Sequence, residues 1–380
     1  MIPYGRQTID EDDIESVVKV LKSDFLTQGP LNDSLNREIC KKIKAQFSVA
    51  TNSCTSALHI ACLALGLKKG DILWTSANSF VASANCALYC GADVDFLDID
   101  PNTGLIDISL MEKKLKAAKI KNSLPKIVIP VHFAGQSCDM ESIYFLSKKF
   151  GFRIIEDAAH ALGAKYNDQP VGSCKYSDLT VFSFHAVKVI TSGEGGAVVT
   201  NSKKLYNKLN LLVTHGITRN EKLFENKTNE GWYYEQKLLG FNYRLTDIQA
   251  ALALSQLKKL DVYITKRHSV ADWYKKELNL PSFIKHLEQK RFGYSSFHLY
   301  VLRIDPKFRD SLFRFLRSKD IGVNLHYIPI YHQPFHRKNI FLKGAEEHYK
   351  SAISIPIFPS ITDDELRKVR DSILNFFEDL

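Results

Sequence analysis

Two residues of this chain carry the groups that one kind of cofactor requires. Lys188 stands in a turn rich in Ser and Gly, after the apolar run Leu179–Phe182 and before Gly193–Gly196. An apolar strand that ends in such a turn is a common way to present an amine to an aldehyde. Asp157 closes a second β-like run that starts at Arg153. An amine for a Schiff base and a carboxylate that keeps the ring nitrogen protonated are what pyridoxal phosphate demands.

Each of these residues also has an ordinary explanation. Lys188 alone is compatible with a surface lysine, and Asp157 alone with the cap of a helix. Their occurrence together, in this order and each beside a predicted strand, favours the cofactor. In open sheets with parallel strands, ligands bind beyond the carboxyl ends of the strands, where both side chains would lie.

A phosphate seat and a stacking ring can also be suggested. The run Asn52–His59 opens a predicted helix with Thr55 and Ser56 in its first turn. Hydroxyls and free N–H groups at a helix N-terminus bind phosphate, although a plain Ser or Thr N-cap has the same appearance. Ser183, at the end of a predicted strand, could reach the same phosphate. Phe80 is either a core residue or a ring that stacks on a flat cofactor.

Other kinds of catalytic site are not indicated. His160, His185 and His326 show neither metal-ligand spacing nor an accompanying acidic cluster, so no metal is predicted. No Ser lies in a nucleophile-elbow context. Gly193–Gly196 is too short and wrongly placed for a dinucleotide fingerprint and is typical of a tight turn.

Short β-like runs alternate with helical patterns over the first two-thirds of the chain. This alternation predicts an α/β fold with a mostly parallel sheet. The predicted strands are Ile72–Thr75, Val94–Leu97, Lys126–Val131, Arg153–Glu156, Leu179–Ser183 and Ala197–Thr200. Helical spacing is found at Leu58, Ala61, Cys62 and Leu65 and again over Met140–Phe150.

The length of 380 residues exceeds one typical domain. A capping box at Thr246–Gln249 opens a long helical pattern that runs towards Leu278, and a second box at Thr362–Glu365 starts a C-terminal helix. We therefore predict a large cofactor-binding domain with an N-terminal arm over residues 1–250. A smaller C-terminal α+β domain would follow over residues 251–380.

The amino-acid composition limits the possible cellular location and the possible binding partners of the protein. Hydrophobic residues make up 45% and charged residues 24%, and no apolar run or signal-peptide pattern indicates a membrane. The seven Cys include no Cys-x-x-Cys pair, so we expect reduced thiols and a cytoplasmic protein. The net charge of +9 comes from short amphipathic Lys runs without interleaved aromatics, which disfavours nucleic acid. A positive field would still help to attract an anionic substrate such as a nucleotide sugar.

Several runs, spread over almost the whole chain, together carry a resemblance to a known family. They are Leu26–Pro30, Asn52–Leu58, Asn78–Ala82, Glu156–His160, Ser183–Lys188, Gly193–Gly196, Gly240–Arg244 and Asn324–Pro329. They resemble the pyridoxal-phosphate-dependent nucleotide-sugar aminotransferases of the DegT/DnrJ/EryC1/StrS family. The resemblance implies a fold-type I aminotransferase architecture and a homodimer with both active sites at the interface.

The same resemblance implies a role for each matching residue. Lys188 would form the Schiff base, and Asp157 would pair with the pyridine nitrogen. The other cofactor contacts would be Phe80 stacked on the ring, His160 beside the phenolic oxygen, Thr55, Ser56 and Ser183 at the phosphate, and Asn242 reaching that phosphate from the neighbouring subunit. The substrate pocket would use Tyr4, Thr27, His185 and His326, the last of these from the second subunit.

Within the family, Trp74–Gly91, Phe133–Met140 and His326–Pro329 look most like the enzymes of pseudaminic acid biosynthesis. This similarity implies that L-glutamate aminates C4 of a UDP-linked 4-keto-6-deoxy-N-acetylhexosamine to give UDP-4-amino-4,6-dideoxy-N-acetyl-β-L-altrosamine. An aminotransferase for another 4-keto-6-deoxy nucleotide sugar, of the perosamine or bacillosamine type, stays an alternative. The dehydratase branch of the family has His where this chain has Lys188, which argues against it.

Overall fold

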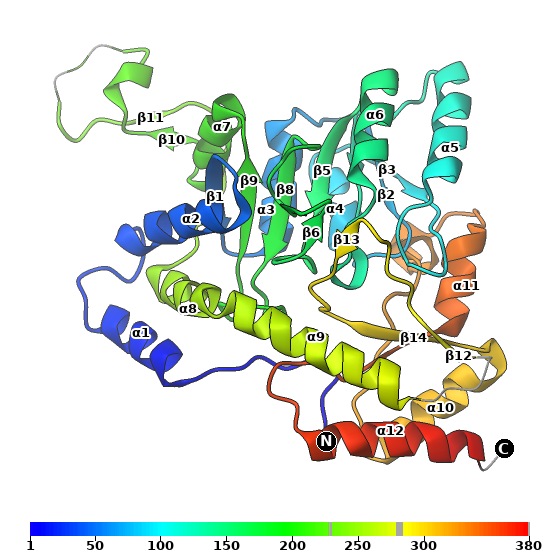
Figure 1. Ribbon diagram of the computed structural model, residues 1–380. Helices are drawn as coiled ribbons and strands as arrows, with labels where there is room; N and C mark the ends of the chain where they lie inside the picture. The colour runs from blue at the N-terminus through cyan, green and yellow to red at the C-terminus, as the bar shows by residue number, and fades with distance from the viewer. Residues whose placement is uncertain (227, 229, 279–283, 379–380) are drawn as a thin grey trace.

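A seven-stranded sheet forms the centre of the computed structural model, which describes residues 1–226, 228, 230–278 and 284–378 (Figure 1). Its strands are β1 (Phe47–Thr51), β2 (Ile72–Ser76), β3 (Asp93–Leu97), β4 (Ile127–Ile129), β5 (Arg153–Asp157), β8 (Leu179–Ser183) and β9 (Gly196–Thr200). They lie in the order β1-β9-β8-β5-β4-β2-β3. β9 is antiparallel to β8 and β1, and the other neighbours are parallel, so the prediction of a mostly parallel sheet is confirmed.

All six predicted strands are present, with ends within two residues of those predicted. The strand β1 was not predicted from the sequence. Its residues include Ser48 and Ala50, and the strand lies at the edge of the sheet, paired with β9 alone among the described strands. A short edge strand of this composition has no strong β-like pattern.

Helices cover both faces of the sheet. Successive residues of a strand point to opposite faces, so both faces carry apolar side chains that the helices bury. Ile127 and Ile129 of β4 lie in the core on one face, whereas Val128 lies in the core on the other. The first face is covered by α3 (Cys54–Ala64), α4 (Ala82–Tyr89) and α7 (Lys203–Val213). The second face is covered by α2 (Pro30–Ile43), α5 (Ile108–Ile120), α6 (Met140–Phe150) and α8 (Asp247–Lys258). Burial on both faces explains the continuous apolar runs of the strands.

The C-terminal part of the chain forms a smaller antiparallel sheet with its own core. Its strands are β12 (Ile284–His286), β14 (Tyr300–Ile304) and β15 (Ala352–Ile355). The helices of this part are α9 (Leu260–Glu277), α10 (Pro306–Ser318), α11 (Lys343–Ser351) and α12 (Asp363–Glu378). Ile2 bridges Ile321, so the N-terminal segment packs here as well. The division into domains of residues 1–250 and 251–380 stays a prediction.

The long helical pattern predicted from Thr246 is two helices, α8 and α9, which meet at Lys259. An interruption of one residue hardly alters the apolar spacing, so the pattern could not reveal it. The capping box at the start of α8 is confirmed, because Thr246 and Gln249 exchange side-chain to backbone hydrogen bonds of 3.2 and 3.1 Å. Thr362 and Glu365 make the equivalent pair before α12.

The remaining elements are short or peripheral. They are α1 (Glu11–Leu21), the strands β6 (Lys165–Tyr166), β7 (Gln169–Pro170) and β13 (Gly293–Tyr294), the hairpin of β10 (Ile217–Thr218) and β11 (Glu235–Gln236), and 3-10 turns at Phe133–Gly135, Glu221–Leu223, Ile330–His332 and Pro334–His336. The β10–β11 hairpin stands away from the sheet beyond α7 (Figure 1). Within the described residues, no helix has the length and apolar character needed to cross a membrane.

Candidate active site

A cavity of about 570 Å³ lies beyond the carboxyl ends of β5 and β8. Ligands bind at this edge in open sheets with parallel strands. Residues from strand ends, from the start of α3, from the N-terminal segment and from the stretch before Ile328 form its wall. Nine of the twelve residues predicted for the site line the cavity: Tyr4, Thr55, Phe80, Asp157, His160, Ser183, His185, Lys188 and His326.

Lys188 follows β8 in a turn closed by a hydrogen bond of 2.9 Å from its N–H to the carbonyl of His185. Burial of the ammonium lowers the pKa of Lys188 to about 8, although Cys54 and Asp157 favour the charged form. An ordinary Lys is almost fully protonated at pH 7, whereas a pKa near 8 leaves about one amine in ten unprotonated. Lys188 therefore offers a nucleophile or base near neutral pH.

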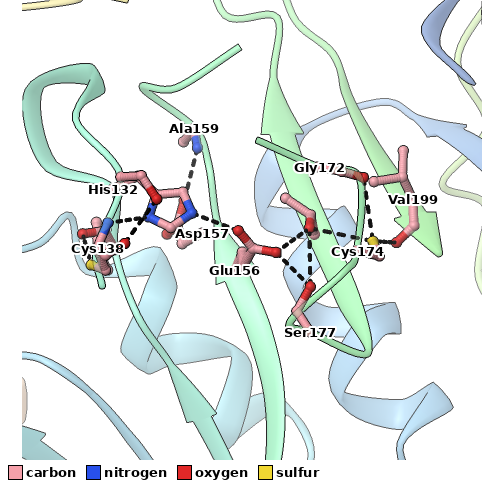
Figure 2. Close-up of polar contacts among 12 residues, drawn as sticks. His132, Cys138, Glu156, Asp157, Ala159, Gly172, Cys174, Ser177 and Val199 are labelled. Carbon is pink, nitrogen blue, oxygen red and sulfur yellow. Dashed lines mark hydrogen bonds and ion pairs between the residues drawn. The ribbon is translucent and has the colours of Figure 1, made fainter. Parts of the chain in front are cut away.

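Asp157 ends β5, and only 5% of its surface is exposed. Its Oδ2 accepts a hydrogen bond from the Ser83 hydroxyl (2.7 Å), and its Oδ1 accepts one from the N–H of Ala159 (3.1 Å), as Figure 2 shows for Ala159. Its backbone N–H donates to the carbonyl of Pro130, and its carbonyl accepts from the N–H of His132. The carboxylate thus has a fixed position in the cavity wall.

Glu156, the neighbour of Asp157 on β5, has separate partners on the opposite face (Figure 2). Its carboxylate accepts hydrogen bonds from Ser177 (2.5 Å) and Thr180 (3.0 Å) and lies 2.8 Å from Nε2 of His132. The backbone N–H of Cys138 donates to Nδ1 of His132. The proton of the imidazole therefore sits on Nε2, which donates a hydrogen bond to Glu156. Burial raises the pKa of Glu156, but these hydrogen bonds outweigh burial and lower it. β5 therefore carries two carboxylates in different surroundings.

His160 lines the cavity beside Tyr327, whose hydroxyl lies 3.0 Å from Nε2 of the imidazole. Burial lowers the pKa of His160 well below its ordinary value, and the charges of Lys188 and His326 act in the same direction. The ring is therefore neutral at pH 7. Its Nδ1 is buried and has no hydrogen-bond partner among the described residues, so the ring keeps an unused hydrogen-bonding capacity.

The N-terminus of α3 lines the cavity and is a seat for an anion. Ser53 caps the helix by accepting a hydrogen bond of 3.1 Å from the N–H of Ser56. The other N–H groups of a first turn have no partner within the helix, and the helix dipole makes this end positive. Gly196 of β9 allows the close approach, because a Cβ there would lie 2.7 Å from the backbone nitrogen of Cys54. Ser183 is paired with Gly196, which brings its hydroxyl to the same side.

The donor set of the cavity fits pyridoxal phosphate. The start of α3 and the hydroxyl of Ser183 suit a phosphate group. Lys188 supplies an amine of lowered pKa, and Asp157 supplies a carboxylate for a protonated ring nitrogen. Phe80, which is 61% exposed, lines the cavity with an aromatic face for a flat ring. A phosphorylated aldehyde with a basic ring nitrogen would satisfy each of these groups.

Three predicted residues do not line the cavity in the described part of the chain. The hydroxyl of Ser56 donates to Oδ1 of Asn52 (2.6 Å) and so serves the start of α3. Thr27 is exposed and forms a bridge with Thr246. Asn242 is exposed on the segment after β11. Their cofactor and substrate roles stay predictions.

His326, expected from a second subunit, lines the cavity of its own chain instead. Its Nδ1 lies 2.8 Å from the hydroxyl of Ser354 on β15. The next residue, Tyr327, donates its N–H to Oδ1 of Asn78 (2.8 Å), just after β2. These long-range hydrogen bonds hold the segment of His326 and Tyr327 at the cavity. Sequence spacing alone does not indicate this position.

Ser83, Asn324 and Tyr327 also line the cavity, and the sequence analysis did not single them out. Ser79 precedes α4, so helical spacing does not link its hydroxyl to that of Ser83, and no local pattern indicated the pair. Tyr327 lay inside a run that carried the family resemblance, but nothing local indicated its contact with His160.

Known proteins resemble the chain over its whole length. A family model described as the DegT/DnrJ/EryC1/StrS aminotransferase family matches residues 7–374. The UDP-4-amino-4,6-dideoxy-N-acetyl-β-L-altrosamine transaminase of Campylobacter jejuni subsp. jejuni serotype O:23/36 (strain 81-176) is 40% identical over 385 residues, which cover 100% of this chain and 98% of that protein.

Solved structures of aminotransferases also resemble this chain. PseC of Helicobacter pylori, an aminotransferase involved in the biosynthesis of pseudoaminic acid, has a TM-score of 0.91 and 32% identity, with 100% of both chains covered. The pyridoxal phosphate form of Spr1654 from Streptococcus pneumoniae has a TM-score of 0.88 and 26% identity, with 100% of this chain and 99% of that chain covered. The predicted fold class is confirmed. Because the family model and these relatives span the chain almost from end to end, the chain belongs to the DegT/DnrJ/EryC1/StrS aminotransferase family and is a pyridoxal-phosphate-dependent aminotransferase.

Proposed function

We propose that this chain transfers the amino group of L-glutamate to C4 of a UDP-linked 4-keto-6-deoxy-N-acetylhexosamine. The product would be UDP-4-amino-4,6-dideoxy-N-acetyl-β-L-altrosamine, a precursor of pseudaminic acid. The observation that carries the proposal is a cavity with Lys188 and Asp157 in a chain 40% identical, over its full length, to a transaminase named for that product.

Pyridoxal phosphate, when bound, supplies a carrier for the amino group and a ring that accepts electrons. In this proposal Asp157 holds the proton of the ring nitrogen, and Phe80 stacks on the ring. His160 uses its spare hydrogen-bonding capacity beside the phenolic oxygen. The phosphate is held at the start of α3 by Thr55 and Ser56, by Ser183 and, from a second copy, by Asn242.

Lys188 has two roles in the proposed reaction. Its amine would hold the cofactor between turnovers, and once released it would move the proton from Cα of L-glutamate to the cofactor. In the second half-reaction it returns a proton to C4 of the sugar. A group that both accepts and donates a proton works best when its pKa lies near the operating pH, which agrees with the pKa of about 8.

We assign the sugar pocket to Tyr4, His185 and His326, which line the same cavity. The rings of Tyr4 and His326 have centroids 5.3 Å apart. Burial, with a contribution from the charge of Lys188, lowers the pKa of His326 to about 3, so this ring would act as a neutral hydrogen-bonding group. His185 is exposed, and its Nε2 lies 3.8 Å from a carboxylate oxygen of Glu194.

The test follows the visible absorbance of the protein loaded with pyridoxal phosphate. L-Glutamate is expected to remove the visible band, because the first half-reaction transfers its amino group. UDP-4-keto-6-deoxy-N-acetylaltrosamine is then expected to restore the band, and mass spectrometry should find the UDP-4-amino sugar.

The other outcomes separate the alternatives. A band that is lost with glutamate but not restored by this sugar would reject the substrate and turn attention to perosamine-type or bacillosamine-type 4-keto sugars. A wild-type protein that shows no visible band with pyridoxal phosphate would overturn the proposed role of Lys188.

The lowered pKa of Lys188 makes a prediction about uptake of the cofactor. Only an unprotonated amine attacks an aldehyde, so the uptake rate of the cofactor-free protein should rise about tenfold per pH unit below pH 8 and level off above it. Stopped-flow absorbance between pH 6 and pH 10 would measure this rate. A rise that continues to pH 10 would show that Lys188 titrates like an exposed lysine.

We propose further that the active unit is a homodimer with shared sites. Thr27 and Asn242 are exposed and away from the cavity of their own chain, among the described residues. Large apolar side chains are exposed in the same parts of the sequence: Phe25 (54%), Leu26 (48%), Trp232 (70%) and Leu239 (80%). Exposed apolar side chains of this kind favour a protein interface. In a dimer, Asn242 would reach the phosphate and Thr27 the sugar of the partner.

A complementation experiment tests the shared site. Lys188→Ala and Asn242→Asp, co-expressed with different tags and purified as the hybrid dimer, should regain about half of the wild-type activity, because one of the two sites is then intact. The matched control combines Lys188→Ala with Asp157→Asn, whose residues belong to the same cavity, and should stay inactive. A hybrid no more active than its parents would show that Asn242 does not serve the partner's site.

We also propose that the protein works in the cytoplasm. All seven Cys are free thiols, which suits a reducing compartment. Fractionation of cells that express the tagged protein would check this, and recovery in a secreted or periplasmic fraction would contradict it.

A further inference from the structure

A chain of two buried hydroxyls leads to the carboxylate of Asp157. The hydroxyls of Ser79 and Ser83 lie 2.7 Å apart, and the Ser83 hydroxyl lies 2.7 Å from Oδ2 of Asp157. Ser79 is 3% exposed and Ser83 is 1% exposed, so solvent hardly competes for either contact. Both residues line the cavity that holds Lys188.

The direction of the hydrogen bonds in this chain follows from the proton count. A carboxylate only accepts, and a hydroxyl has one proton to donate. Ser83 therefore donates to Asp157, and its own oxygen accepts the proton of Ser79. The second carboxylate oxygen of Asp157 accepts the N–H of Ala159 (3.1 Å). Each carboxylate oxygen thus has one protein donor among the described residues, and the group is held at both ends.

The local structure fixes the position of the two hydroxyls. Ser83 lies in the first turn of α4, and its backbone N–H donates to the carbonyl of Phe80 (3.2 Å). Ser79 immediately precedes Phe80, the side chain proposed to stack on the ring. The preceding residue, Asn78, is held by the N–H of Tyr327. One short segment therefore supplies both the aromatic face and the hydroxyls that hold the carboxylate.

We propose that Ser83, with Ser79 behind it, is a positioning residue that aims the carboxylate of Asp157 at the ring nitrogen of the cofactor. This inference rests on the proposed function, since it assigns a role within the same site. A carboxylate that loses one of its two donors can rotate, and its hydrogen bond to the ring nitrogen is then formed only part of the time. Hydrogen bonds to charged groups are the stronger ones, so the loss should be measurable.

The test compares Ser83→Ala with wild type in cofactor binding, in the rate of the half-reaction with L-glutamate and in the pH at which the ring nitrogen titrates. We expect Ser83→Ala to weaken pyridoxal phosphate binding about tenfold and to slow the half-reaction with L-glutamate by a similar factor. The pH at which the ring nitrogen titrates, read from the absorbance of the bound cofactor, should fall. Ser83→Thr, which keeps the hydroxyl, should restore all three quantities.

Ser177→Ala is the matched control. Ser177 also donates its hydroxyl to a carboxylate of β5 (Figure 2), but that carboxylate is Glu156, which is absent from the cavity wall among the described residues. The Ser177→Ala variant should have a lower melting temperature than wild type. Its cofactor affinity and the titration of the ring nitrogen should be unchanged. Cofactor affinity and ring titration of Ser83→Ala equal to those of wild type would overturn the inference, as would equal losses in Ser177→Ala. Wild-type protein that does not bind pyridoxal phosphate would instead overturn the proposed function.

Discussion

Replacement of Lys188 by alanine is expected to lower turnover by about 10⁴-fold or more, the largest effect that a single change in this chain should have. The side chain is asked to do two things, to hold the cofactor and to move a proton on and off the substrates. Alanine can do neither. The measurement is the steady-state rate of amination with L-glutamate and the 4-keto sugar, together with the cofactor content of the purified variant.

Two controls separate a chemical defect from a folding defect. Lys175→Ala removes an exposed lysine from the same part of the sequence and should keep the wild-type rate. A small primary amine in solution should partly rescue Lys188→Ala. Truncation of the lysine side chain leaves a space in the wall of the cavity, and a small amine can enter it. Turnover by Lys188→Ala within about tenfold of wild type would exclude both roles, since removal of an acid–base group alone costs at least about 10²-fold.

The positions of Asp157 and Lys188 could be predicted from the sequence because strand ends are local features. An apolar run followed by Ser, Gly or a charge marks the end of a buried strand. The carboxyl ends of parallel strands meet at one edge of a sheet. Residues far apart in the chain are thereby brought to the same cavity without knowledge of the strand order.

The choice between two adjacent carboxylates shows how far such reasoning extends. Glu156 and Asp157 are neighbours, and strand alternation places them on opposite faces. Asp157 was predicted because it closes the β-like run, and Glu156 was not considered as a site residue. The structure adds the reason, since Glu156 is engaged with His132 and Ser177 behind the sheet.

Contacts between distant segments could not be predicted. Asn324 pairs with Ser354, and Tyr327 reaches both Asn78 and His160, so this wall of the cavity depends on how the C-terminal sheet packs against the central one. No local period encodes that packing. A role for Asn242 is even less local, because it requires a second chain.

Asp157→Asn is expected to lower the rate roughly 10³-fold, the second largest effect. Asparagine keeps the size of the side chain and can still accept a hydrogen bond from Ser83. A neutral amide, however, cannot hold a proton on the ring nitrogen, so the ring would stabilise developing negative charge poorly. The rate of the half-reaction with L-glutamate and the pH dependence of the cofactor absorbance both report this loss.

Glu156→Gln is the decisive comparison, since it makes the same chemical change one residue earlier on the same strand. Glutamine would lose the charge that His132, Ser177 and Thr180 stabilise, so the melting temperature should fall. The rate per folded molecule should stay close to that of wild type, because this side chain is absent from the cavity wall among the described residues. Equal losses of rate in the two variants would trace the effect to the packing of β5. A loss confined to Asp157→Asn, with a displaced ring titration, would trace it to the ring nitrogen.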